Sequence, residues 1–427
     1  MRTRTPGRVA WGMKFFTALH SPALGLLFGL GSALTCQAED PTYYRGNTHT
    51  HSLWSDGNDF PEMIVDWYQQ QGYDFIALSD HNILAEGDKW MAVEAVKSRQ
   101  KVPGAGAMEK YRARFGETWV KTREKDGKTE VRLSTLEEYR GRFEKPGEFL
   151  IVPAEEISST WRTASAPKGL PVHINVVNVK EVIKPAIRPT AVETMRAVLL
   201  SVLEQERVTG QPMLAHLNHP NFQWAITAEE IAQVVEERFV EIYNGHPGVH
   251  HLGDATRPGQ EKIWDIANTI RLRDLHAAPL WGVATDDSHN YHGGEVSPGR
   301  GWVMVRAAAL EAGALVTAMK AGDFYASSGV TLREIRFDPS TRRLSVSLVV
   351  EPGATYRCEL IGTRRAADAP VGEVFASKTG ASVDFDLPED ALYGRITITA
   401  SVPHGNPSFE GQKKQAWTQP VGWEQTR

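Results

Sequence analysis

The chain carries a dense group of ligand-type side chains at residues 49–57, His-Thr-His-Ser-Leu-Trp-Ser-Asp-Gly. Residues i and i+2 of an extended strand point to the same side, so His49 and His51 can converge on one metal ion. Asp56, beyond a turn closed by Gly57, adds a harder oxygen ligand. An H-x-H pair is often only two solvated side chains on a strand edge, so this stretch alone leaves both interpretations open.

The distribution of the other histidines favours the metal interpretation. Twelve of the 14 histidines lie between His49 and His292, several of them beside carboxylates. The further clusters lie in or directly after segments with the pattern of strands. They are Ser79-Asp80-His81-Asn82, Glu155-Glu156-Ile157-Ser158, His173-Ile174-Asn175, His216-Leu217-Asn218-His219 and Asp286-Asp287-Ser288-His289. A β/α barrel brings the carboxyl ends of its strands to one mouth, so these distant residues can meet in one pocket.

The segments that must position these clusters alternate between strand and helix. Apolar runs predict strands at 43–47, 73–79, 149–154, 172–179, 212–217, 239–245, 279–285 and 302–305. Amphipathic segments predict helices at 61–68, 190–210, 226–236, 263–275 and 310–322. This alternation predicts an α/β domain over residues 39–330, with its functional residues at the carboxyl edge of the strands.

Two segments depart from this alternation. Residues 84–148 are rich in charges of both signs and predict a helical insertion over the barrel mouth, a solvated lid rather than an anion funnel. Residues 331–427 contain short alternating strands separated by Gly and Pro turns, which predicts a small all-β, sandwich-like C-terminal domain. A packing role suits this domain best, and binding of glycans or a cell surface is the alternative.

Composition gives no sign of a nucleic-acid partner. The 427 residues are 41% hydrophobic and 23% charged, which is typical of a globular protein. The formal net charge of -5 provides no basic stripe for a phosphate backbone. A small-molecule partner is therefore expected, and the sequence leaves the oligomeric state open.

The N-terminus has the pattern of an export signal over residues 1–38. Basic residues precede an apolar run of about 14 residues, shorter than the roughly 20 needed to span a bilayer, and cleavage is expected after Ala38. Met13 is an alternative start. Cys36 as a lipid-modified first residue is a weaker alternative, because the residues before it match a lipoprotein box poorly. We expect a periplasmic or secreted protein without a transmembrane segment after signal removal.

Taken in order, the motifs H-x-H with S-D-G, S-D-H-N, E-E-I-S, H-I-N, N-H-P and D-D-S-H resemble those of the PHP superfamily, the polymerase and histidinol phosphatase type of metallohydrolase. The resemblance covers about Tyr43 to Val330. The signal, the large insertion and the stretch Glu-Ile-Tyr-Asn-Gly-His-Pro at 241–247 are similar to the branch that includes carbaryl hydrolase. The resemblance implies a distorted (β/α)7 barrel.

The resemblance also implies a set of metal ligands. His49, His51 and Asp287 would hold one ion, Glu156 would bridge it to a second ion bound by His173 and His219, and Asp56, His81 and His289 would complete a third position. Glu156 is preferred over Glu155, and His219, next to Pro220, over His216. His246, His250 and His251 match no ligand position of the family. Nitrogen and oxygen ligands without thiolate suit two or three ions of Mn, Zn or Fe.

Clustered divalent ions would supply hydroxide near neutral pH and stabilise charge that develops on a substrate. His289 or His81 could protonate the leaving oxygen if the third position is empty. Arg300 is a candidate anion clamp, with a structural salt bridge as the equal alternative.

These features predict a metal-dependent hydrolase, and a phosphoesterase acting on a small or envelope-derived substrate is the leading hypothesis. Hydrolysis of a carboxyl or carbamate ester is the first alternative, for which Trp54, Trp161, Phe222 and Trp224 could form an apolar pocket. A non-catalytic, metal-dependent binding protein is the second.

Overall fold

The computed structural model describes residues 42–104, 106–164 and 166–424. The predicted signal peptide at 1–38, with Met13 and Cys36, lies outside the described residues. Within the described part, no helix combines the length and the apolar character needed to cross a bilayer.

The first sheet contains the strand that leads into the His49 motif. β1 is Thr42–Asn47, β2 is Phe75–Ile76 and β6 is Leu150–Ile151, and these three strands run parallel. β13, Trp302–Ala307, pairs antiparallel with β1, and β14, Phe324–Ser327, pairs antiparallel with β13. The polar residues after β1 and β2 therefore lie at the same edge of this sheet.

The second sheet supplies most of the other motif residues. Its order is β12 (Trp281–Thr285), β11 (Phe239–Asn244), β10 (Leu214–Leu217), β8 (Leu170–Val177), β7 (Ala154–Trp161) and β9 (Ile187–Arg188). β10, β11 and β12 are parallel, whereas β8 is antiparallel to both β7 and β10. The β7–β8 pair is thus a hairpin where a strict β/α barrel would have a crossover helix.

Backbone hydrogen bonds connect the two sheets at the motif residues. The His51 amide donates to the Ser288 carbonyl over 3.0 Å, and the Asp287 amide donates to the His49 carbonyl over 2.9 Å. A second parallel bridge joins His81 to Glu156. The mixed α/β class is as predicted. The strands of this domain belong to two sheets, which isolated bridges between Thr50 and Ser288 and between His81 and Glu156 join at the motif residues. β2 is only two residues long, and β8 runs antiparallel to both of its neighbours.

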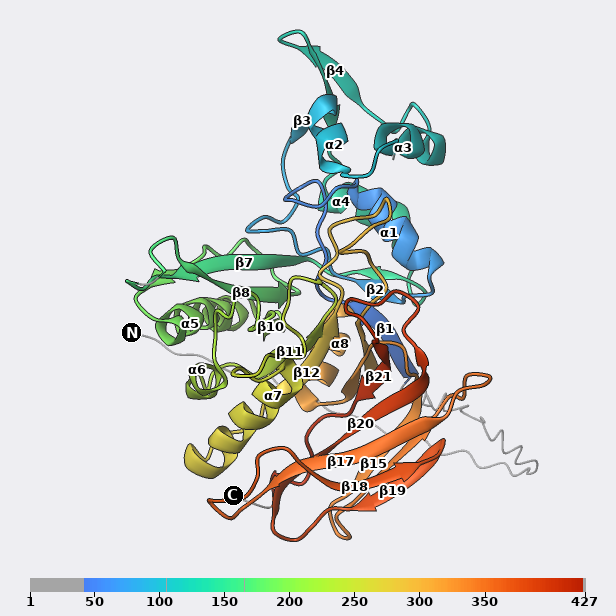
Figure 1. Ribbon diagram of the computed structural model, residues 1–427. Coiled ribbons are helices and arrows are strands. Elements are labelled where there is room, and N and C mark those ends of the chain that lie inside the picture. Colours follow the sequence, from blue (N-terminus) through green and yellow to red (C-terminus); the bar gives the residue numbers. More distant parts are fainter. Residues whose placement is uncertain (1–41, 105, 165, 425–427) are drawn as a thin grey trace, which may run out of the picture. The chain divides into compact units, whose positions relative to one another are not determined.

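Helices pack beside the second sheet (Figure 1). They are α5 (Ala191–Thr209), α6 (Ala228–Gln233) and α7 (Gln260–Thr269), which continues into the π-helix η1 (Ile270–Asp274). α5 begins where the Thr190 side chain accepts from the Glu193 amide and ends at Gly210, whose φ of 67° suits glycine. Met195, Val198 and Val202 of α5 join the core that lies against β7 and β8. α1 (Pro61–Gln70) and α8 (Ala312–Ala321) belong to the first sheet's side.

The insertion at 84–148 is mixed rather than all helical. It contains α2 (Val93–Arg99), α3 (Ala107–Phe115) and α4 (Leu136–Phe143), together with an antiparallel sheet of β3 (Trp90–Ala92), β5 (Lys128–Arg132) and β4 (Thr122–Lys125), which Figure 1 shows with α2 and α3. The turn between β4 and β5 is Asp126-Gly127, with φ of 50° and 72°. An Asp-Gly pair with two positive φ angles is a hairpin signal, and it explains the strands that the helical prediction missed.

The C-terminal part is all β, but it shares a sheet with the preceding domain. β15 (Leu332–Asp338), β16 (Arg343–Leu348) and β19 (Ser382–Asp386) form a three-stranded sheet, while β18 (Glu373–Thr379), β17 (Tyr356–Arg364), β20 (Ala391–Pro403) and β21 (Lys413–Trp417) continue the first sheet through β14. Leu344 and Val346 from one sheet and Cys358 and Ile396 from the other share one core. All described residues fall in a single compact unit, and β21 joins the parts on either side of residue 330.

Candidate metal centre

The structure brings all nine predicted ligand residues together. His49 and His51 follow β1, His81 follows β2, Glu156 lies on β7 and His173 on β8, and His219 follows β10. Asp287 and His289 follow β12, and Asp56 lies in the turn after β1. Seven of the nine residues follow the carboxyl end of a strand, as predicted, whereas Glu156 lies near the start of β7 and His173 lies within the antiparallel strand β8.

The Glu156 carboxylate lies at the middle of the group. Its Oε2 is 3.5 Å from His49 Nε2, 3.2 Å from His51 Nε2 and 3.0 Å from His81 Nδ1. Its Oε1 is 2.9 Å from His173 Nδ1 and 3.5 Å from His219 Nε2. Five imidazoles around one buried carboxylate form the surroundings that a bridging ligand would have.

Asp287 provides the second carboxylate. Its Oδ1 lies 3.3 Å from the Nε2 atoms of both His49 and His51, and 3.6 Å from His289 Nδ1. The backbone at Asp287 has φ of 48°, and that at His219 has φ of 26°, in a region that non-glycine residues rarely adopt. Such strain at two neighbouring candidate ligands is characteristic of functional sites.

Four overlapping groups of these side chains offer ligand atoms within 4.8 Å of one another. The group His49, His51 and Asp287 equals the first predicted position, and the group His51, Asp56, His81 and His289 contains the third. The predicted second position is divided, because Glu156 groups with His49 and His219 on one side and with His81 and His173 on the other.

The chemistry of the donor atoms fits divalent cations. His49 Nε2, both ring nitrogens of His51 and His173 Nδ1 are buried and make no hydrogen bond within the described residues, although carboxylate oxygens lie within 4 Å. Buried polar atoms without partners are costly, and a metal ion placed between nitrogen and carboxylate would satisfy them. The nitrogen and oxygen donors of the four groups suit Mn, Zn or Fe.

Electrostatics also favour positive charge here. Burial disfavours a charged imidazole at His81, but Glu156 and Asp56 outweigh it and raise the pKa of His81 to about 11. Burial opposes ionisation of Glu156, yet His81, His173 and His49 hold the pKa of Glu156 well below its usual range. Protons and divalent cations therefore compete for the same atoms, so metal binding should release protons.

A buried glutamate that sequence reasoning missed orients two of the histidines. Glu241 Oε1 accepts from His49 Nδ1 over 2.7 Å, and its Oε2 accepts from the His219 amide over 2.7 Å. A carboxylate behind a histidine fixes the ring so that its other nitrogen faces the metal. The available signal was a charged residue inside the buried strand Phe239–Asn244.

Asp80 holds the turn that carries Asp56. Its Oδ1 accepts from the Ser52 amide over 2.8 Å and from the Ser55 amide over 3.0 Å, and its Oδ2 accepts from Ser52 Oγ over 2.6 Å. The turn therefore has a fixed path even though the Asp56 side chain is 54% exposed.

Two neighbours of the predicted ligands lie outside the four groups. Glu155 points away from Glu156, its Oε1 accepts from the Ile183 amide over 2.6 Å, and burial raises the pKa of Glu155 to about 7. His216 is fully buried, and burial lowers its pKa to about 4.

Within the described residues, Arg300 forms no salt bridge, and its guanidinium instead donates to neutral acceptors. Its Nη1 donates to the Gly245 carbonyl over 2.8 Å, and Nε and Nη2 each lie 3.3 Å from Asn406 Oδ1. Asp286 accepts from the amides of residues 299–301 and from the Tyr68 hydroxyl, and so holds this turn. Arg300 is buried, and it is not among the described residues that line the cavity of the metal centre.

A cavity of about 360 Å³ opens onto the centre. Seven predicted ligands line it, together with Lys101, Phe222, His246, Asn290 and Val296. His81 and His289, the two candidate proton donors, are therefore accessible to a substrate. Of the three loop histidines without a family position, His246 alone is among the lining residues of this cavity.

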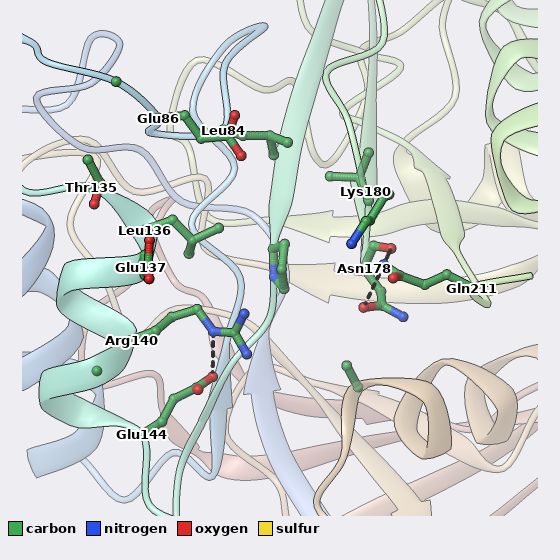
Figure 2. A pocket seen from close by; sticks show the side chains of 15 residues that line it. Leu84, Glu86, Thr135, Leu136, Glu137, Arg140, Glu144, Asn178, Lys180 and Gln211 are labelled. Atoms are coloured by element: carbon green, nitrogen blue, oxygen red, sulfur yellow. Dashed lines mark hydrogen bonds and ion pairs between the residues drawn. The ribbon is translucent and has the colours of Figure 1, made fainter. Parts of the chain in front are cut away.

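A larger cavity of about 760 Å³ lies elsewhere, between α4 and the segments around Asn178 and Gln211 (Figure 2). Two pairs of its polar side chains bind each other, Arg140 with Glu144 over 2.9 Å and Gln211 with Asn178 over 3.2 Å. The four candidate metal groups share no residue with its lining. The larger cavity thus contains none of the candidate metal ligands, and the ligand side chains identify the smaller cavity as the candidate functional site.

No protein-family model matches the chain, and no curated protein is significantly similar to it. Among solved structures, a two-domain protein from Bacteroides vulgatus, described as containing a predicted PHP-like metal-dependent phosphoesterase, is 14% identical with a TM-score of 0.37, over 89% of this chain and 96% of that one. A proposed metal-dependent phosphoesterase from Bifidobacterium adolescentis is 11% identical with a TM-score of 0.32, over 61% and 91%.

An amidohydrolase from Chromobacterium violaceum, with bound sulfate and no metal, is 14% identical with a TM-score of 0.29, over 57% of this chain and 87% of that one. At these identities and TM-scores, the functional argument rests on the side chains of the centre. The resemblance of the chain to PHP-type metallohydrolases lies in the order of those side chains along the sequence.

Proposed function

We propose that this protein is a metal-dependent phosphoesterase of the PHP type that uses two or three divalent ions, Mn, Zn or Fe. The observation that carries the proposal is the convergence on one cavity of seven imidazole and carboxylate side chains from six strands or the turns that follow them, next to buried imidazole nitrogens that have no hydrogen-bond partner within the described residues. When bound, divalent ions would acidify a water molecule and polarise the phosphoryl group.

The chain's own residues would position the metal ligands and protonate the leaving oxygen. Glu241 orients His49, and Asp80 holds the turn that carries Asp56. His81 and His289 line the cavity, and either could protonate the leaving oxygen when the third position holds no ion. In the reaction, the water oxygen bonds to phosphorus, the ester P–O bond breaks, and the proton goes to the released oxygen.

The character of the cavity favours a phosphate ester over a carboxyl or carbamate ester. Phe222 and Val296 are the apolar side chains among its described lining residues. The indole nitrogens of Trp54 and Trp161 donate to the carbonyls of Ser134 and Ala225, and Trp224 stacks on His250. Of the four aromatic residues that could form an apolar pocket, Phe222 lines the cavity, whereas Trp54, Trp161 and Trp224 are not among its described lining residues.

Purified protein supplied with Mn or Zn should be assayed against p-nitrophenyl phosphate, its diester and p-nitrophenyl acetate. We expect turnover of a phosphate ester that disappears with a chelator. Faster cleavage of the acetate would favour the esterase alternative, and bound metal without turnover of any substrate would favour a binding protein.

Export is part of the proposal and rests on the basic and apolar sequence of residues 1–38. The expected location is the periplasm or the cell exterior, where the substrate would be a small or envelope-derived ester. N-terminal sequencing of the mature protein tests it, with residue 39 as the expected first residue.

A further inference from the structure

Two side chains of the insertion at 84–148 donate hydrogen bonds to the turn that carries Asp56. Lys89 Nζ donates to the Trp54 carbonyl, and Arg99 Nη1 donates to the Ser55 carbonyl over 2.5 Å. Both cations come from the insertion, and both carbonyls belong to the turn between His51 and Asp56. The insertion therefore has a fixed position relative to the metal centre.

The residues after Arg99 are held just as closely. Gln100 is buried, and its carbonyl lies 3.4 Å from Asn58 Nδ2. Asn58 also binds Asn290 Oδ1 over 3.2 Å through Nδ2 and accepts from the Tyr291 amide over 2.9 Å. The segment that follows α2 is thus tied to both loops that border the cavity.

Lys101 comes next, and it lines the cavity of the metal centre. Its backbone φ is 56°, in the left-handed region where a residue with a β-carbon is disfavoured. Lys101 directly follows Gln100, the C-cap residue of α2, and a left-handed residue at this position commonly ends a helix and redirects the chain. Within residues 42–104, 106–164 and 166–424, its ammonium group has no hydrogen-bond or ion-pair partner.

The charges in the cavity call for a strongly anionic ligand. The lining carboxylates Asp56, Glu156 and Asp287 already face histidines of the centre. Two or three divalent ions would more than neutralise these carboxylates, and Lys101 adds a further positive charge. The excess suits a doubly charged phosphate monoester better than a singly charged diester.

We propose that Lys101 is a substrate-binding residue by which the insertion selects small, dianionic phosphate monoesters. The proposal rests on the phosphoesterase function and narrows it to one substrate class. A cavity of about 360 Å³ is near the lower end of ligand pockets, which fits a small leaving group. Hydrolysis converts the monoester and water into an alcohol and inorganic phosphate, without an oxidant or reductant.

The test compares Lys101→Met with Lys97→Met in the full-length, metal-loaded protein. Lys97 lies on the exposed face of α2, four residues earlier, and does not line the metal cavity. We expect Lys101→Met to raise KM for p-nitrophenyl phosphate by roughly tenfold to a hundredfold, the loss of one charge-assisted contact. The diester's KM should change by a few-fold at most, and Lys101→Arg should restore most of the monoester preference.

Metal content and melting temperature should stay unchanged in Lys101→Met, because Lys101 is neither a ligand nor buried. Equal effects on both esters, or no effect on either, would overturn the assignment. Calorimetric titration with inorganic phosphate separates this outcome from failure of the proposed function. If the wild type hydrolyses neither ester, weaker phosphate binding by Lys101→Met still supports the anion site, whereas equal binding, or none by the wild type, rejects it.

Discussion

Glu241→Gln tests whether the metal centre depends on a group that touches no substrate. Glu241 is fully buried and accepts four hydrogen bonds. On Oε1 they come from His49 Nδ1 and Thr285 Oγ1, each over 2.7 Å, and on Oε2 from the His219 amide over 2.7 Å and Asn244 Nδ2 over 2.9 Å. Glutamine has the same shape but only one acceptor oxygen.

The expected cost follows from that count. With its NH2 group in place of Oε2, the amide faces two donors, the His219 amide and Asn244 Nδ2, that lose their acceptor. With its NH2 group in place of Oε1, His49 must present Nδ1 as an acceptor and carry its proton on Nε2, the nitrogen that faces the metal site. A buried donor left without a partner costs about 1–3 kcal/mol, so the loss of two acceptors should lower the unfolding free energy by roughly 2–6 kcal/mol. His49 also loses the carboxylate that fixes its ring, and loss of such a partner typically weakens metal binding by about 10- to 100-fold.

Competition against a chromophoric chelator measures the affinity for Mn or Zn, and urea unfolding measures stability. Glu155→Gln is the matched control, because Glu155 is also a buried glutamate but accepts from the Ile183 amide and faces away from the ligands. This control should bind metal like the wild type. The reasoning is refuted if Glu241→Gln binds metal as tightly as Glu155→Gln does.

Three further outcomes are expected. The double change His49→Ala and His51→Ala should abolish both metal binding and hydrolysis, which metal analysis and the ester assay would show together. Burial raises the pKa of Glu237 from 4.5 to about 7, so the folded state holds this proton more tightly and loses stability as pH rises through that window. Glu237→Gln should therefore gain up to about 3 kcal/mol over the wild type at pH 8 and little at pH 4.5, as measured by urea unfolding. Arg300→Met should lower the melting temperature, since the Gly245 carbonyl and Asn406 lose their donors, while KM stays within a few-fold.

Local signals sufficed for the elements with clear ends. The helix predicted at 190–210 is found as Ala191–Thr209, because its threonine cap, apolar stripe and terminal glycine all lie within the segment. The ends of the strands also had local signals. A ligand-type residue directly after an apolar run marks the end of the strand and lies at the edge of the sheet where that strand ends. These local signals located the ligand-type clusters, whereas the choice of individual metal ligands within them was implied by the resemblance to the PHP superfamily.

The pairing and direction of the strands could be predicted less well from the sequence. β8 has the alternation of a strand, but its antiparallel direction depends on the short connection after Trp161 and not on its own residues. The hairpin in the insertion carried an Asp-Gly signal, yet its charged strands lack the apolar alternation that usually marks them. Topology of this kind is set by tertiary contacts that no single segment reveals.

Glu241 and Lys101 show the same limit at the site itself. Glu241 becomes the partner of His49 because β11 pairs with β12, and the β12 end is bridged to the residues after β1, a relation spanning 192 positions. Lys101 reaches the cavity because Arg99 and Gln100 fix the end of α2 against residues 55–58, which belong to the segment that carries Asp56. Ligand identity is therefore encoded where each strand ends, whereas ligand orientation and substrate choice are encoded by which segments become neighbours. Substitutions in the insertion should therefore alter which ester is preferred while the metal ions stay bound. This holds provided that Lys89 and Arg99 keep their contacts to the turn that carries Asp56.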